Sequence, residues 1–187
     1  MKKIILVVFV FVSFLSNAQE TEFTFTSDKG MTDFIVTSIE GKTATDIYKK
    51  VIEWIKVTYK NPDKVILTST DNEFVRFEGY SETLYSYNAK GQNYLPAKYQ
   101  IEISMKDGKY KFDIINFQIL ASTNTWVDYK FFNNPSSKED LEKGVYNKDG
   151  SLKSYCKYFQ EIPTYFNNLN KSLSENIIST VKKSDGW

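Results

Sequence analysis

The spacing of apolar side chains along residues 33–187 predicts both strands and helices. Residues 33–40 alternate between apolar and polar side chains, which is typical of a strand. Thr43 or Thr45 is suited to cap a helix that follows, and Pro62 is expected to end it. The helix would span about four turns and bury one face. Its apolar stripe contains Ile47, Val51, Trp54, Ile55 and Thr58.

The next two stretches predict a hairpin. Residues 64–70 and 73–80 have strand character, and Asp71-Asn72 between them suits a two-residue turn. The expected pairs are Ile66 with Phe77, Leu67 with Arg76 and Thr68 with Val75.

The pattern around Asp107-Gly108 predicts the clearest hairpin, from Tyr99 to Ile119. Asp-Gly suits the positive φ values that a type I′ turn requires. A two-residue loop pairs Met105 with Tyr110, Ile103 with Phe112 and Ile101 with Ile114 on one apolar face. Glu102 then lies opposite Asp113 on the other face, which we expect to be solvated.

The rest of the chain completes an α+β pattern. Residues 83–87 continue a strand, residues 124–132 add another, and residues 133–154 form a loop with a short helix at 138–143. A final helix begins near Pro163. Its apolar stripe contains Phe166, Leu169, Leu173, Ile177 and Val181. The order is therefore strand, helix, four strands and a long helix.

Four segments in this order resemble a known family: residues 47–55, 61–66, 74–79 and 103–110. Over residues 34–117 the chain is similar to exported bacterial proteins, typical of Bacteroidetes, that form a domain of unknown function with a TBP-like fold. The resemblance implies a curved antiparallel sheet in β-α-β4-α order, with two main helices packed on one side. It brings no substrate and no catalytic residues, and a fold alone does not imply a function.

The first residues have the order of a secretory signal peptide. Lys2 and Lys3 precede an apolar run at residues 4–15, and small residues lead to a cleavage site between Ala18 and Gln19. A membrane-spanning helix needs about 20 apolar residues, so we interpret the run as a cleaved leader, with an uncleaved anchor as the alternative. We expect export to the periplasm or the extracellular space, and no stable membrane anchor after cleavage.

Cleavage after residue 18 would leave a flexible segment, residues 19–32, and a single domain, residues 33–187. The whole chain has 24 basic and 23 acidic residues. Without Lys2 and Lys3 the count is 22 to 23, a net charge of −1. Such a balance, together with a single arginine, argues against a nucleic-acid partner.

The composition also limits the chemistry. The chain has no histidine, which excludes Ser-His-Asp and Cys-His nucleophiles and the usual zinc sites. The acidic cluster of Glu139, Asp140 and Glu142 alternates with lysines and is expected to be solvated. We therefore expect no cofactor, no metal and no enzymatic activity, while a Ser-Lys pair or a carboxylate dyad remains an alternative.

Aromatic residues are unusually frequent, at 16% of the chain. Core packing explains most of them, because aromatic side chains suit half-buried sheets. Trp126, Tyr129, Tyr85 and Tyr87 lie near polar segments and are alternative candidates for the rim of a ligand site. Cys156, the single cysteine, lies between aromatics and is expected to be buried; an intermolecular disulfide or a reactive thiol is the alternative.

These observations favour a non-catalytic binding module in the periplasm or outside the cell. We expect it to hold a small ligand or a partner between the sheet and the C-terminal helix. The alternative is an envelope interaction protein that uses an exposed strand edge or the loop at residues 133–154.

Overall fold

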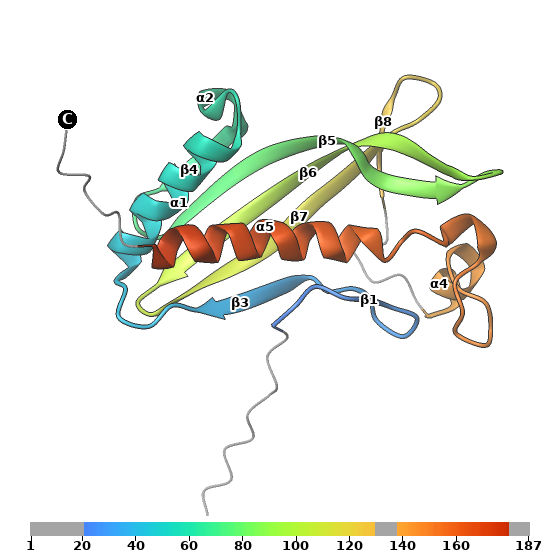
Figure 1. Ribbon diagram of the computed structural model, residues 1–187, viewed down its shortest axis with the longest axis horizontal. Coiled ribbons are helices and arrows are strands. Elements are labelled where there is room, and N and C mark those ends of the chain that lie inside the picture. Colours follow the sequence, from blue (N-terminus) through green and yellow to red (C-terminus); the bar gives the residue numbers. More distant parts are fainter. Residues whose placement is uncertain (1–20, 130–137, 180–187) are drawn as a thin grey trace, which may run out of the picture.

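The computed structural model describes residues 21–129 and 138–179 (Figure 1). The predicted leader and its cleavage site, Ala18 and Gln19, lie outside these residues, as does Val181. The helices are α1 (Ala44–Thr58), α2 (Pro62–Val65), α4 (Lys138–Gly144), η1 (Ser154–Cys156) and α5 (Glu161–Ile178). The strands are β1 (Phe25–Thr26), β2 (Gly30–Met31), β3 (Phe34–Ser38), β4 (Ile66–Thr70), β5 (Phe74–Asn88), β6 (Gln92–Lys106), β7 (Lys109–Leu120) and β8 (Trp126–Asp128).

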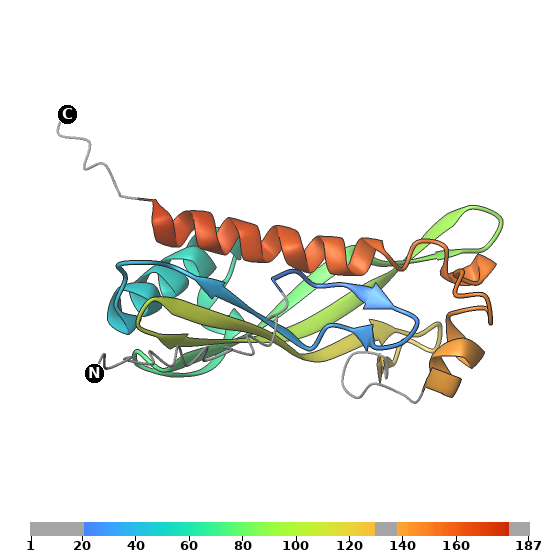
Figure 2. The same ribbon diagram turned by 90° about the horizontal axis from the view of Figure 1, so that it is seen from below.

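The main sheet is antiparallel throughout, with the order β3-β7-β6-β5-β4 and with β8 paired to β7. Figure 2 shows α5 running along one side of the sheet, with α1 beside it. Both helices contact the same face: Trp54 of α1 packs on Phe77, and Phe166 of α5 packs on Tyr99. The predicted α+β arrangement, with two main helices on one side of an antiparallel sheet, is confirmed.

Helix α1 begins and ends near the predicted residues. Thr43, not Thr45, is its cap: the Thr43 hydroxyl accepts from Asp46 N at 3.1 Å, and Asp46 accepts from Thr43 N at 3.3 Å. This reciprocal pair satisfies two backbone donors at the helix start. Of the predicted stripe, Thr58 alone is exposed. Pro62 lies beyond the end of α1 and begins α2.

The β6–β7 hairpin has the predicted register, including Glu102 opposite Asp113. Its turn is not type I′, because only Gly108 of the two central residues has a positive φ, 77°. The turn is held by the loop before α1 and by the first residue of α1: Gly108 N donates to Lys42 O at 2.8 Å, and Asp107 accepts from Ala44 N at 2.8 Å. These contacts to a distant segment explain a turn that local preference did not predict.

The β4–β5 hairpin differs from the prediction by one position. Its loop has an additional residue: Asn72 adopts a φ of 64°, and Glu73 N donates to Thr70 O at 3.1 Å. An irregularity at Leu67 restores the predicted register at the far end. The observed pairs are Thr70–Phe74, Ser69–Val75, Thr68–Arg76 and Ile66–Phe77.

The predicted flexible segment is ordered from Phe23 onward, so this part of the prediction is wrong. Phe23 and Phe25 are each only 2% exposed. Asn167 of α5 binds both backbone groups of Phe23, accepting from N at 2.8 Å and donating to O at 3.0 Å. Burying two aromatic side chains outweighs the polar character of the threonines between them.

The loop after α4 closes one end of the core. Helix α4 confirms the short helix predicted near residues 138–143.

Cys156 is a free, buried thiol, and burial raises its pKa to about 11. A thiol with such a pKa is protonated at neutral pH and is a weak nucleophile. The structure thus favours the buried, inert interpretation of Cys156.

Candidate functional site

The four aromatic candidates do not form one site. Tyr85 is 3% exposed and lies 5.2 Å from Tyr129 between ring centroids, and both contact Phe159. Burial raises the pKa of both tyrosines. Tyr87 packs on Tyr155 at 5.1 Å, at the tip of the β5–β6 hairpin. These three residues belong to the packing at one end of the domain.

Trp126 lies apart from them, on the sheet face opposite the two helices. Its ring is 6.3 Å from Tyr80, and Lys98 Nζ lies 4.5 Å from its centroid. One ring face of Trp126 is therefore already occupied by a cation. The exposed aromatic in this pair is Tyr80, at 52%.

The space between the sheet and α5 is filled by side chains. Phe166 and Phe117 are 0% exposed, and Tyr99 is 1% exposed. A cavity that admits water would leave accessible surface on the side chains around it. Within the described residues, the region predicted to hold a small ligand is therefore a packed core.

A groove lies instead at the outer edge of the sheet. It has a volume of about 700 Å³ and runs between residues 58–65, from the end of α1 through α2, and residues 78–82 of β5. We call it the β5 groove. One signal for it is present in the sequence: Pro62 lies between the end of α1 and β4, where it begins the short helix α2.

The wall formed by β5 includes a stretch of strand edge that β4 does not cover. Strand β4 pairs with β5 only as far as Phe77, and β5 continues to Asn88 with β6 as its one strand neighbour in the described residues. Met105 N donates to Glu73 O at 2.8 Å, so the odd-numbered residues of this part of β5 bond to β6. Glu78 and Tyr80 therefore direct their N–H and C=O groups outward.

The inner end of the groove is a chain of tyrosine hydroxyls. Tyr99 OH lies 3.2 Å from Tyr59 OH and 2.8 Å from Tyr165 OH, and Tyr59 lines the groove. Burial raises the pKa of Tyr59 and of Tyr99, so both hydroxyls are neutral and can donate. Gly79 makes room for this arrangement, because a Cβ there would lie 2.1 Å from Tyr99 Cζ.

The charges around the groove are mixed. Lys60 and Lys64 lie on one side, with Glu78 and Glu82 on the other. Gln100 Nε2 donates to Glu78 Oε2 at 3.3 Å. Among residues 21–129 and 138–179, no cluster of carboxylates and Cys is suited to hold a metal ion. The arrangement is suited to hydrogen bonding with a polar chain.

Comparison with known proteins agrees with the fold. Residues 35–120 match the model of DUF4468, a domain of unknown function with a TBP-like fold. The resemblance predicted from the sequence is thereby confirmed. No curated protein matches the chain.

Two solved structures are similar to this chain. One is a DUF4468 family protein from Bacteroides ovatus, with a TM-score of 0.61 and 14% identity, covering 86% of this chain and 93% of that one. The other is a TBP-like protein from Parabacteroides distasonis, with a TM-score of 0.51 and 16% identity, covering 77% of this chain and 90% of that one. At such identities the likeness shows the fold alone.

Proposed function

We propose that this protein is an extracytoplasmic, non-catalytic binding module that holds an extended segment of a partner protein in the β5 groove. The observation that carries the proposal is the free outer edge of β5 beyond Phe77, which forms one wall of the groove. Exposed strand edges pair readily with other chains, since their N–H and C=O groups lack partners. An added strand gains affinity from main-chain hydrogen bonds and specificity from pockets for alternate side chains.

The irregularity in β5 limits the length of this edge. Pairing with β6 shifts between Ser81 and Tyr85. Such bulges bend a strand and interrupt pairing. The bound segment would therefore pair with residues 78–81, and its side chains would meet Val65 on one side and Tyr80 on the other.

The non-catalytic part of the proposal rests on the titrating groups. In the described part of the chain, the groups with raised pKa are tyrosines and Cys156, whose shifts move them away from neutral pH. General acids and bases need pKa values close to the working pH. The predicted leader supports an extracytoplasmic location. No helix in residues 21–129 and 138–179 has the length and apolarity needed to cross a bilayer.

A displayed library of 12-residue peptides, panned against residues 19–187, tests the proposal. Bound peptides should slow hydrogen exchange of the Tyr80 amide, measured by NMR on the wild-type protein. Tyr80→Pro removes this outward donor and should weaken binding at least tenfold. Tyr80→Ala keeps the donor and should weaken binding less.

Two results would overturn the proposal. One is protection of amides elsewhere with no change at Tyr80. The other is equal affinity of the proline and alanine variants, provided that their thermal unfolding shows both to be folded.

A further inference from the structure

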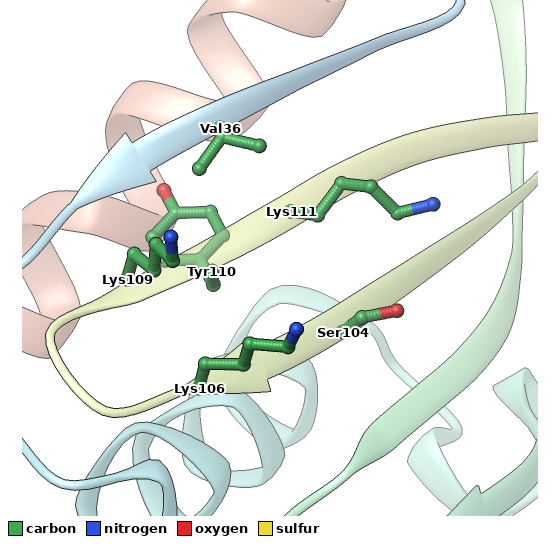
Figure 3. A pocket seen from close by; sticks show the side chains of 6 residues that line it. All are labelled: Val36, Ser104, Lys106, Lys109, Tyr110 and Lys111. Atoms are coloured by element: carbon green, nitrogen blue, oxygen red, sulfur yellow. The ribbon is translucent and has the colours of Figure 1, made fainter.

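A second depression lies near the β6–β7 turn, on the face of the sheet opposite α1 and α5, which we call the uncovered face. An inference drawn from it goes beyond the proposed function. Its volume is about 270 Å³. Figure 3 shows its lining: Val36, Ser104, Lys106, Lys109, Tyr110 and Lys111.

Strand register brings the three lysines of this depression together. Lys106 pairs with Lys109 directly across the hairpin, and Lys111 pairs with Ser104. Like charges in directly opposed positions destabilise a sheet. The chain therefore carries an electrostatic cost at this place in the fold.

The nearby carboxylates do not offset all of this charge. Asp113 binds Lys111 Nζ at 2.7 Å, and Asp107 accepts from Ala44 N at 2.8 Å. Within residues 21–129 and 138–179, neither Lys106 nor Lys109 has a carboxylate within ion-pair distance. Two ammonium groups thus remain for a ligand.

We infer that this depression binds the phosphate group of an anionic ligand. Lysine ammonium groups are compact point charges that suit a tetrahedral anion with several oxygens, whereas planar carboxylates favour the arginine fork. Val36 supplies an apolar wall, which weakens the competition from water. Ser104 Oγ already donates to Glu102 Oε1 at 3.3 Å, so the contacts to phosphate come from Lys106 and Lys109.

The test uses inorganic phosphate and a matched pair of double variants. Phosphate should raise the unfolding midpoint of residues 19–187 above the midpoint in chloride at equal ionic strength. NMR shifts should cluster at residues 104–111. Lys106→Gln with Lys109→Gln should weaken phosphate binding at least tenfold, and without phosphate it should unfold at a higher temperature than the wild type.

The control double variant, Lys90→Gln with Lys148→Gln, removes the same charge from two exposed loops. It should leave phosphate binding unchanged. Equal phosphate responses of the two double variants, or equal stabilisation by chloride, would overturn the inference.

Two further probes separate the sources of the phosphate group. Glycerol 3-phosphate represents a soluble ester, and vesicles of phosphatidylglycerol, compared with phosphatidylcholine, represent a lipid headgroup. Binding of either probe supports the site if it requires Lys106 and Lys109. The probe that binds shows whether the phosphate group belongs to a soluble ester or to a lipid headgroup. Binding of neither probe would contradict the inference.

Discussion

The two faces of the main sheet differ in what they contribute. The face under α1 and α5 is lined by side chains that are almost fully buried, such as Phe77, Ile103 and Phe112, each 0% exposed. The other face carries paired charges that water still reaches, such as Arg76 with Glu102. Buried apolar surface stabilises a fold far more than exposed ion pairs do. The covered face therefore holds the domain together, and the other face contributes less to its stability.

The largest difference between the two faces is expected when one tryptophan on each face is replaced. Trp54 is 2% exposed, packs on Phe77 and donates from Nε1 to Ser172 Oγ at 3.0 Å. Trp54→Ala should lower the free energy of unfolding by about 3–5 kcal/mol, measured by chemical denaturation.

Trp126→Ala is the matched change on the uncovered face. The Trp126 ring contacts Tyr80 and Lys98, and a cation–π contact at an exposed site is worth about 0.5–1 kcal/mol. We expect a loss of about that size. Equal and large losses from the two tryptophan variants would show that both faces contribute alike.

A methyl group at Gly79 tests how tightly the covered face is packed. The new Cβ of Gly79→Ala would overlap the Tyr99 ring, so the ring must move away from residue 79, which disturbs its hydrogen bond with Tyr165. Overpacking of this kind costs about 1–3 kcal/mol. In a Tyr99→Leu background the same change should cost clearly less, and a double-mutant cycle measures the difference. Additive losses would exclude the overlap as the cause.

The two long hairpins show what the sequence could and could not predict about the fold. In β6–β7 a slip by one residue would turn every apolar side chain outward, so the pattern alone specified the register. In β4–β5 most residues of β4 are exposed, and the pattern did not distinguish a two-residue loop from the observed one. The N-terminal segment was misjudged because its partner, α5, is far away in sequence.

The candidate site was harder to predict than the fold. The sequence pattern singled out aromatic residues as candidates for the rim of a ligand site. One of them, Tyr85, is part of the core. The β5 groove depends on where β4 stops pairing, which the position of α2 determines. The predicted hairpin register already places Lys106, Lys109 and Lys111 on one face of the sheet. The sequence did not predict that no helix covers this face, and only then can the lysines reach a ligand.

Alkaline pH should lower the free energy of unfolding of the domain. Burial raises the pKa of Tyr110 to about 12, and that of Cys156 to about 11, above their values of 10 and 9 in an unfolded chain. The contribution of these two groups to the free energy of unfolding is complete below pH 9. It is lost as the pH rises from 9 to 12, because the unfolded chain releases these protons first. Denaturation curves at pH 8, 10 and 11 should show falling stability, and Tyr110→Phe should reduce the fall. A flat profile would contradict the burial of these groups.

The smallest effect is expected from the charges of the uncovered face. Arg76 Nη2 lies 2.8 Å from Glu102 Oε2, and the two side chains are 40% and 20% exposed. Arg76→Ala should therefore cost no more than about 1 kcal/mol at low salt, and less in high salt, where screening weakens exposed pairs. Part of that loss comes from Glu102, which then faces Asp113 with Lys111 as the one cation paired to them in residues 21–129 and 138–179. Arg76→Lys keeps the charge and should recover most of the loss. A cost above about 2 kcal/mol that salt does not reduce would mean that this face is stabilised as strongly as the covered one.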